Sequence, residues 1–503
     1  MTIIAPAGVL QRTSQLLGTI GGWTFLAGIA LLAALVPLMG TPIPRSAYVI
    51  PFLGQFTIAV LAYWVAWLRL GSDRIPLVLI WVFAVLFRLV LLLTTPTLSD
   101  DIYRYLWDGQ LLTRGVNPYL YPVDSPALAG YSTAIRTLVN HSWMASPYLP
   151  TAQGYFALLT GLFSQNVFVF QLAAVLLDFS TAWLVMDMLI RLKLPAAGVL
   201  IYLWHPLLIF EYAQNAHVDA LMIFWVILSF WLIVRGVTGS SHPGSLATGS
   251  VLSMAAATLT KGLPLLLVPL FFRRWGLKRL FAFGMLIVII LAFFSLEAGW
   301  GLFGPLDGKG IFGAIRIYLS DWNFNGSLYH WLEVSMSGYS TPGAVPQHVA
   351  GPQSILLTKL ITNSLFLLVI AITGFWAWRN DRPGKHDVIT RTRALLRLAL
   401  VPLCAYIIFT PTVHPWYLAV VIPFAPFLLS SGYGDGQARR FLWPLLYLSC
   451  TIVLSYMTYV DPNEWREFNW VRNVEYVPFY ALLLWAALPW LRKLPRLRLI
   501  SSP

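Results

Sequence analysis

The chain has 503 residues, of which 58% are hydrophobic and only 11% are charged, with a mean hydropathy of +0.72. A soluble domain carries about 25% charged residues, so this composition excludes a soluble protein and indicates an integral membrane protein. The net charge of +13 would suggest nucleic-acid binding in a soluble chain, but most basic residues stand in short clusters between apolar runs. This is the positive-inside pattern, so we expect membrane lipid as a partner and no nucleic acid.

Cysteine usage and the N-terminal region narrow the class further. Cys404 and Cys450 both lie in apolar segments and show neither a disulfide framework nor zinc-ligand spacing. The first apolar run, Leu17–Met39, is long enough to span a bilayer and lacks a convincing cleavage site. We therefore expect it to be a membrane span rather than a cleaved signal peptide.

The apolar runs predict an all-α polytopic membrane protein with about twelve transmembrane helices, several of them near the lower length limit for a bilayer. These runs are Leu17–Met39, Ala47–Leu70, Ile75–Thr94, Val167–Leu192, Ala196–Tyr212, Ala220–Arg235, Leu280–Glu297, Ile355–Trp378, Leu395–Phe409, Trp416–Leu429, Leu442–Val460 and Val477–Leu491. The basic clusters between them are expected on the cytoplasmic side. They are Arg69/Arg74, Arg191/Lys193, Arg235, Arg273/Arg274/Lys278/Arg279, Arg379/Arg382/Lys385, Arg439/Arg440 and Arg492/Lys493/Arg496.

One segment does not fit a single crossing. Arg235 and Arg273 are both expected in the cytoplasm, yet the residues between them are mostly apolar. We interpret Leu246–Leu259 and Leu263–Phe272 as a short re-entrant helix pair with Lys261 at its tip. Such irregular backbone is tolerated only where protein or a water-filled cavity surrounds it. A pair of full spans is the alternative, and it also keeps both basic clusters inside.

With both termini in the cytoplasm, the long connections fall on the outer face. They are Pro96–Asn166, Gly299–Ser354 and Asp461–Tyr476, and they are rich in Trp and Tyr. The chain shows no internal repeat and no separate soluble region. The sequence therefore predicts a single transmembrane domain over residues 1–503, with amphipathic surface helices and the functional chemistry in the outer loops, 96–166 and 299–354.

An acidic pair opens the first outer loop in the stretch SDDIYRYLWDGQLL, residues 99–112. Asp100 and Asp101 precede Ile102–Trp107, which has the pattern of a helix on the membrane surface. An acidic residue at this position can cap the helix and suits its dipole. A carboxylate at the membrane surface can equally act as a general base toward a hydroxyl group.

Other ionisable residues gather at the predicted outer ends of spans. Charged groups at membrane depth are costly, which makes each one a functional candidate. His217 and Asp219 are two residues apart, which is compatible with metal ligation but is no zinc signature. Polar residues that only satisfy one another between helices are the structural alternative. The set comprises Glu211, His217, Asp219, Lys261 and His414, with Trp416 and Tyr417 beside His414.

Several of these stretches together resemble the GT-C glycosyltransferases, and among them the polyprenol-phosphate-mannose-dependent mannosyltransferases of bacteria. They are SDDIYRYLWDGQLLTRGVNPY, HPLLIFEYAQNAHVDAL, LTKGLPLLLVPL, DWNFNGSLYHWL and TPTVHPWYL, and they follow the family order between Phe87 and Leu418. The resemblance implies that an acidic residue of the first outer loop is the catalytic base. Asp101 is favoured over Asp100 because its distance to Arg104 and Tyr105 is similar to an Asp-x-x-Arg-Tyr spacing of some relatives; Asp100 is then expected to cap the helix.

The resemblance also implies a substrate and a mechanism. The implied donor is a polyprenyl-phosphate-linked hexose, which is mannose in the family. The implied acceptor is a hydroxyl of a glycolipid or glycan, with inversion in a single displacement. The loop holds Asp-Asp and no Asp-x-Asp, so no metal or other cofactor is indicated. Residues expected on the donor phosphate or sugar are Arg104, Tyr105, Glu211, His217, Asp219, Lys261, His414, Trp416 and Tyr417. Residues expected on the acceptor side are Trp322 and Asn325.

The predicted location is the bacterial inner membrane, with the active site on the periplasmic face and the endoplasmic reticulum as the alternative. A transporter or flippase of a lipid-linked sugar is the main competing function. It predicts related halves, which the sequence does not show. A non-catalytic envelope assembly protein would leave the acidic pair and the outer-face charges without a shared role.

Overall fold

The computed structural model describes residues 22–39, 44–70, 75–303, 306–337, 352–382, 384, 386–429 and 436–492. Within these ranges the chain is helical, and its β-structure is limited to isolated bridges of Phe324 and Asn325 with Thr412. The predicted all-α class is therefore confirmed. The start of the first apolar run, the middle of the second outer loop and the basic residues Arg74, Lys385, Lys493 and Arg496 lie outside the described residues.

The first half of the bundle is built from long helices and one crosswise pair. In chain order they are α2 (Gly22–Leu35), η1 (Val36–Met39), α3 (Arg45–Leu68), α4 (Leu77–Leu92), α5 (Asp101–Thr113), η2 (Pro126–Tyr131), η3 (Ala134–Leu138), α6 (Pro150–Phe163), α7 (Val167–Arg191), η4 (Ala196–Val199), α8 (Leu200–Leu203), α9 (Pro206–Ala213) and α10 (Asp219–Val237).

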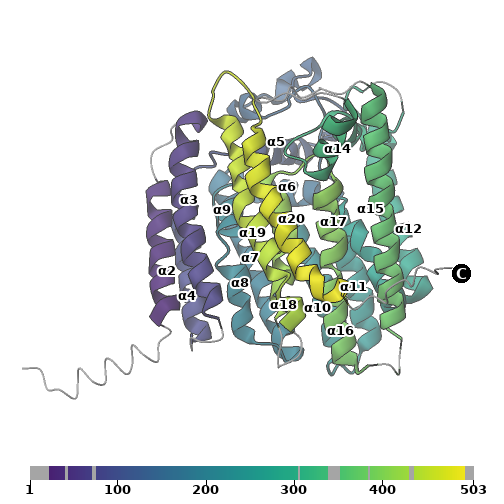
Figure 1. Ribbon diagram of the computed structural model, residues 1–503. Coiled ribbons are helices and arrows are strands. Elements are labelled where there is room, and N and C mark those ends of the chain that lie inside the picture. Colours follow the sequence, from purple (N-terminus) through teal and green to yellow (C-terminus); the bar gives the residue numbers. More distant parts are fainter. Residues whose placement is uncertain are drawn as a thin grey trace, which may run out of the picture.

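The second half adds both interior and lipid-facing members of the bundle and the C-terminal helix (Figure 1). These elements are α11 (Pro243–Thr258), η5 (Leu263–Phe271), α12 (Phe272–Ala298), α13 (Gly313–Asp321), α14 (Leu328–Ser337), α15 (Pro352–Asn380), α16 (Val388–Leu398), α17 (Leu400–Phe409), η6 (Pro415–Val420), η7 (Ile422–Leu428), α18 (Gly436–Arg439), α19 (Leu442–Thr451), η8 (Ile452–Tyr459) and α20 (Asn469–Leu491).

Seven described segments are long and apolar enough to cross a membrane, or eight if the bent pair Ala196–Leu203 and Pro206–Ala213 counts as one span. The seven are Arg45–Leu68, Val167–Arg191, Asp219–Val237, Leu263–Ala298, Ile355–Asn380, Val388–Phe409 and Gly436–Tyr459. The chain is therefore a multi-pass membrane protein. The described parts of the twelve predicted spans lie largely in helical segments. However, three apolar helices are shorter than a full span: Gly22–Leu38, Leu77–Leu92 and Pro415–Leu428. The C-terminal helix α20 is not among the seven either, so the described residues support seven to eight crossings.

Burial separates lipid-facing helices from interior ones. In Ile355–Asn380, only 11% of the most apolar 18-residue stretch is buried. In Gly436–Tyr459, 67% of the corresponding stretch is buried. Exposed leucines cover the outside of α15, where Leu356, Leu360 and Leu367 project away from the bundle. Large apolar surfaces of this kind are stable in contact with hydrocarbon and not in contact with water.

The two ends of the bundle differ in character. Arg273 donates to the carbonyl of Trp378 over 2.8 Å, and Arg274 pairs with Asp381 over 2.5 Å. Arg274 and Asp381 contact the first turns of α16, which lies at the lower end in Figure 1. The connections that contain α5, α6 and α14 lie at the upper end (Figure 1). This separation of basic clusters from long loops is the one that the charge pattern predicts.

The chain reverses at the predicted position around Lys261. The Lys261 ammonium meets Asp219 at one end of α11, while Arg279 donates to the carbonyl of Gly244 over 3.2 Å at the other end. The second limb, η5, is a 3₁₀-helix rather than an α-helix. It continues directly into α12, which is kinked at Gly276, whose φ is 71°. A φ of this sign suits glycine, which lacks a Cβ atom.

A break between α8 and α9 sets the direction of α9, which carries Glu211. Pro206 begins α9, and the pair is bent by 59°. The Arg88 guanidinium donates to the freed carbonyl of Leu203, and its Nε lies 2.9 Å from Asp178. Backbone groups released inside a membrane need such partners. The ion pair thus fixes the direction of α9, which leads to Glu211.

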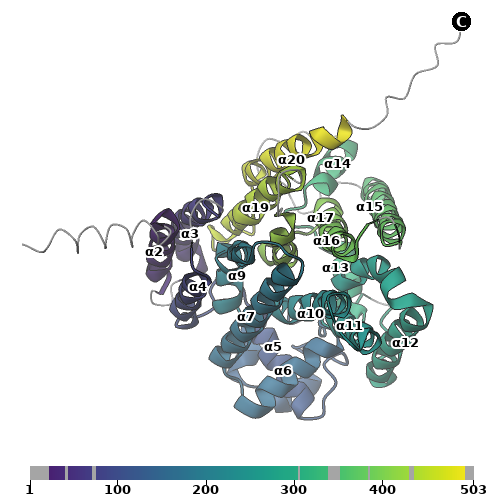
Figure 2. The same ribbon diagram turned by 90° about the horizontal axis from the view of Figure 1, so that it is seen from below.

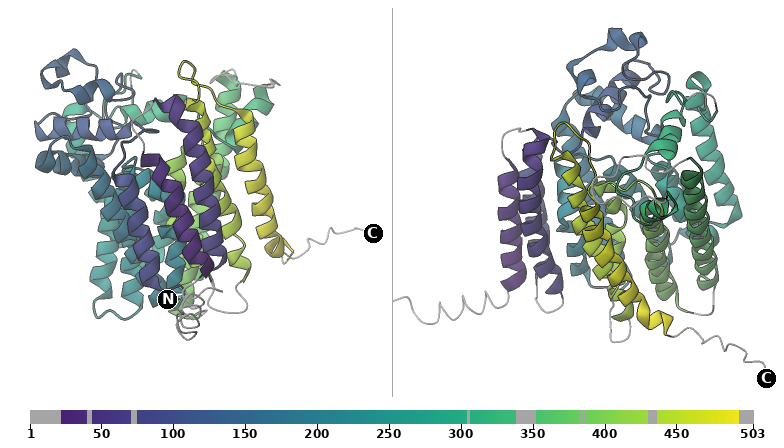
Figure 3. Two further views of the ribbon diagram at one scale, coloured as in Figure 1. Left: turned by 90° about the vertical axis from the view of Figure 1, so that its left-hand side faces the viewer. Right: turned by 45° about the horizontal axis from the view of Figure 1, so that its top comes forward.

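α5 and α6 lie across the end of the bundle rather than along it (Figures 2 and 3). They pack closely because Gly109 has no side chain: a Cβ atom there would lie 2.5 Å from the Phe156 carbonyl oxygen. Tyr105 stacks on Phe156 at 4.6 Å between ring centroids. The segment 96–166 is therefore folded against the bundle end, as the surface-helix pattern predicts.

Candidate active site

The two adjacent aspartates point to different partners. Asp100 occupies the N-cap position of α5, but its side chain makes no capping hydrogen bond and instead pairs with Arg45 at the start of α3. The prediction that Asp100 caps the helix is thus wrong for the side chain. Successive residues at a helix start project about 100° apart, so Asp101 faces away from Arg45 and toward His217.

Asp101 stands at the centre of a group of polar side chains. Its Oδ1 accepts a hydrogen bond from Asn140 Nδ2 over 3.1 Å, and its Oδ2 lies 3.8 Å from His217 Nδ1. Burial raises the pKa of Asp101, but His217, Lys261 and the Asn140 hydrogen bond together lower that pKa below its ordinary value. The side chain is 19% exposed, so an ionised carboxylate is available to a substrate.

His217 is fully buried between two carboxylates. Its Nε2 lies 3.2 Å from Glu211 Oε2, and its Nδ1 faces Asp101. Glu211 is itself fixed, because it accepts hydrogen bonds from Tyr456 over 2.7 Å and from Asn215 over 2.9 Å. The sequence EYAQNAHVDAL thus brings Glu211 and His217 together, as the clustering of its polar residues predicts.

Lys261 and Asp219 form a separate pair at the reversal of α11. Their side chains meet at 2.7 Å, and the ammonium lies 5.9 Å from the centre of the Tyr417 ring. Asp219 therefore faces Lys261, whereas His217 faces Asp101 and Glu211. Among the described residues no group of three or more His, Cys, Asp or Glu side chains is placed to hold a metal ion.

Four rings from distant segments form one stack beside Asp101. Trp416 lies between His217, at 4.2 Å, and His414, at 4.5 Å, and Phe324 stacks on the far side of His414 at 4.7 Å. Burial lowers the pKa of His414 to about 3. His414 is consequently neutral near pH 7, and the predicted role as a cation facing a phosphate does not fit it.

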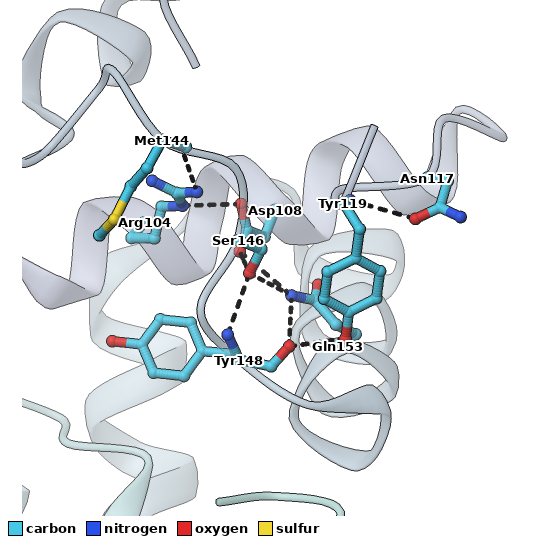
Figure 4. Close-up of polar contacts among 8 residues, drawn as sticks. All are labelled: Arg104, Asp108, Asn117, Tyr119, Met144, Ser146, Tyr148 and Gln153. Carbon is cyan, nitrogen blue, oxygen red and sulfur yellow. Dashed lines mark hydrogen bonds and ion pairs between the residues drawn. The ribbon is translucent and has the colours of Figure 1, made fainter. Parts of the chain in front are cut away.

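Arg104 belongs to a buried network that holds the loop after η3 to α5 (Figure 4). Its Nε lies 3.0 Å from Asp108, and its Nη2 donates to the Met144 carbonyl over 3.1 Å. Ser146 and Gln153 also donate to Asp108. With only 3% of its side chain exposed, Arg104 is placed to position the loop rather than to meet a phosphate as predicted.

The remaining predicted residues divide between the site and its surroundings. The Tyr105 hydroxyl accepts a hydrogen bond from the Val218 backbone over 3.4 Å, which ties α5 to the His217 turn. Trp322 lies 4.7 Å from the ring of His141 at the edge of the site. Asn325 is 4% exposed and donates to Glu475 over 2.7 Å. Its side chain faces α20, so the predicted acceptor-side role does not fit its position.

Sequence reasoning did not assign Asn140, Tyr456 or Arg45 to the site. Tyr456 is 245 residues from Glu211 and gives no local signal. Asn140 sits in an Asn-His-Ser triplet that reads as a glycosylation sequon. Arg45 is a single basic residue before an apolar run, and it gives no local signal of its ion pair with Asp100, 55 residues away.

These features define a polytopic all-helical membrane protein with a buried carboxylate–imidazole cluster at one end of the bundle. The family model described as alpha-(1→6)-mannopyranosyltransferase, N-terminal domain, matches residues 14–276, slightly more than half of the chain. The chain belongs to this mannosyltransferase family. The matched range includes Asp101, His217 and Lys261. In the same comparisons no curated protein and no solved structure matches the chain.

Proposed function

We propose that the protein transfers mannose from a polyprenyl-phosphate donor to a hydroxyl group of a glycolipid or glycan on the non-cytoplasmic face of the inner membrane. The observation that carries this proposal is the Asp101 carboxylate, which is ionised, partly exposed and held by Asn140 at the α5 end of the bundle. We also propose that the shorter apolar helices and α20 complete twelve crossings, which places this end outside.

Asp101 acts as the general base in this proposal. The acceptor hydroxyl attacks the anomeric carbon of mannose, its proton passes to Asp101, and the bond from that carbon to the phosphate oxygen breaks. The polyprenyl phosphate leaves with the electron pair while its tail stays in the bilayer. One displacement inverts the anomeric centre.

Lys261 is placed to stabilise the leaving phosphate. Its side chain is 23% exposed, and its ammonium is paired on one side with Asp219. Charge grows on the phosphate oxygens as the bond breaks, and a fixed cation is most effective where charge develops. Tyr417 and Trp416, on the adjoining segment, are proposed to contact the sugar or the first isoprene units.

The test compares Asp101→Asn with Asp100→Asn in purified protein, with radiolabelled polyprenyl-phosphate mannose as donor and extracted envelope glycolipids as acceptors. We expect Asp101→Asn to fold and to lose transfer by about 100-fold or more, since a positioned general base contributes that much. Asp100→Asn weakens only the ion pair with Arg45 and should retain most activity. The reverse pattern would move the base to Asp100.

A flippase for a lipid-linked sugar is the second candidate function. The broken α8–α9 helix with the buried Arg88–Asp178 pair favours it, since discontinuous helices line the substrate sites of many transporters. Movement of labelled donor lipid across vesicle membranes by wild-type protein, without transfer to any acceptor, would support the flippase and contradict the transferase.

A further inference from the structure

An exposed aromatic group lies beside the proposed base, where the first and second outer loops meet. Trp143 is 47% exposed and His141 is also exposed, while the neighbouring Met144 is buried. The His141 ring lies 6.3 Å from Trp143 and 4.7 Å from Trp322, measured between centroids. We refer to Trp143, His141 and Trp322 as the aromatic platform.

The platform is fixed rather than loose. Beneath it, Met144 packs on α13 with Ala314 and Ile317, and Trp322 covers this small cluster. The Met144 carbonyl accepts a hydrogen bond from the buried Arg104, as Figure 4 shows. The loops approach so closely that a Cβ atom on Gly308 would lie 2.7 Å from the Cβ of Met144.

The backbone of the platform is also strained at His141, next to the site. His141 has a φ of 48°, which side chains other than glycine rarely adopt. Such conformations persist where the surroundings enforce them and cluster at functional sites. The preceding residue, Asn140, donates directly to Asp101, and the charge of Asp101 acts on His141. His141, the first residue of the platform, therefore directly follows the residue that donates a hydrogen bond to the proposed base.

We infer that the aromatic platform binds the acceptor, and that the acceptor presents a carbohydrate ring to it from the water side. The inference rests on the proposed function, because it extends the site of Asp101. Aromatic rings offer large, rigid contact area at low entropic cost, and the apolar C–H face of a pyranose ring packs on such surfaces. Ser142 and Asp124, whose backbones are hydrogen-bonded over 3.0 Å, add polar groups at its edge.

Acceptor binding by the platform can be distinguished from anchoring of its tryptophans in the membrane. A tryptophan at the membrane interface anchors a protein in lipid whatever the substrate. A platform tryptophan instead affects one substrate: the acceptor sugar, and not the lipid-linked donor. The two roles therefore differ in which KM value a substitution changes.

The direct test measures binding of α-1,6-linked mannotriose to the full chain in detergent by saturation-transfer NMR. It uses the Asp101→Asn background, so that no turnover occurs. We expect Trp143→Ala to weaken binding about tenfold, the loss that follows from removing about one aromatic stacking interaction. Trp143→Phe should recover much of that loss. Trp470→Ala is the matched control, because Trp470 is 48% exposed and lies at the start of α20.

A kinetic test with active protein should show the same change as a raised acceptor KM, with an unchanged donor KM. Equal mannotriose binding by the Trp143→Ala and Trp470→Ala variants would overturn the platform and leave the mannosyltransferase proposal standing. Weakened binding in Trp143→Ala together with a wild-type protein that transfers no sugar would contradict the proposed function and support the platform as a glycan-binding site.

Discussion

At the scale of single residues, His217 decides the charge state of the proposed base. It is fully buried and faces both Asp101 and Glu211, so its removal takes away one of the groups that keep the Asp101 pKa low. Burial acts in the opposite direction, and the pKa of Asp101 should rise when His217 is replaced by Gln. Lys261, His414 and Asn140 also face Asp101 and remain in that variant.

The predicted outcome is a shift of the acid limb of kcat/KM to higher pH in His217→Gln. In wild type this limb should lie below the usual aspartate range of about 4, because a lowered pKa keeps the carboxylate ionised to lower pH. The measurement is a pH profile of sugar transfer for both proteins. His242→Gln is the control, since His242 is exposed near the basic end of the bundle. An unchanged limb in His217→Gln would show that another group sets it.

The residue scale is also where sequence reasoning was weakest. Polar clustering predicted that Glu211, His217 and Lys261 belong near Asp101, because ionisable residues are costly at membrane depth and mark functional sites. It could not predict the direction of each side chain. Arg104 faces Asp108 and Asn325 faces Glu475, and both partners are set by tertiary packing that no local pattern records.

At the scale of elements, the contact of α5 with α6 depends on Gly109. Substitution by Ala would place a Cβ atom 2.5 Å from a backbone oxygen of α6, which cannot move without shifting the helix. We expect Gly109→Ala to lower the free energy of unfolding by about 1–3 kcal/mol and to reduce activity by displacing Asp101. Gly154→Ala on α6 meets nothing within 4 Å and should be neutral or stabilising by up to about 1 kcal/mol. Thermal unfolding of the two variants in detergent compares them, and equal stabilities would contradict the packing argument.

The buried Arg88–Asp178 pair governs the break between α8 and α9. Removing one partner leaves an unpaired charge inside the membrane and frees the Leu203 carbonyl. Arg88→Met should therefore cost about 3–5 kcal/mol of unfolding free energy, and the double variant Arg88→Met/Asp178→Leu should recover much of it. Thermal unfolding measures both. Arg191→Met, which breaks a partly exposed pair with Asp187, should cost less than about 1 kcal/mol. A double variant as unstable as Arg88→Met would indicate that the Leu203 hydrogen bond dominates.

Element order was the most predictable property of the chain, because the lengths of apolar runs and the positions of charge clusters can be read directly from the local sequence. The reversal at Lys261 followed from the need to keep Arg235 and Arg273 on one side. The number of crossings did not follow, since Leu77–Leu92 and Pro415–Leu428 are apolar but short. Neither could the sequence distinguish the 3₁₀ form of η5, which depends on how Pro264 and Pro269 interrupt α-helical hydrogen bonding.

At the scale of the whole molecule, the proposed chemistry requires that the α5 end faces away from the cytoplasm. The basic residues that meet Trp378 and Asp381 lie at the opposite end, and the positive-inside rule places that end in the cytoplasm. An enzyme that uses a lipid-phosphate donor outside the cell then has its base, Asp101, and the aromatic platform on the same side as the acceptor glycan.

Cysteine labelling decides this orientation. Thr137 is exposed near the α5 end, and Ser241 is exposed between α10 and α11 at the other end. In a background with Cys404→Ala and Cys450→Ala, we expect Thr137→Cys to react with a membrane-impermeant maleimide in spheroplasts whose inner membrane is intact. Ser241→Cys should react only after the membrane is permeabilised. The opposite pattern would place Asp101 in the cytoplasm, where a soluble nucleotide sugar is as accessible as a lipid-linked one, and would remove the reason for assigning a polyprenyl-phosphate donor.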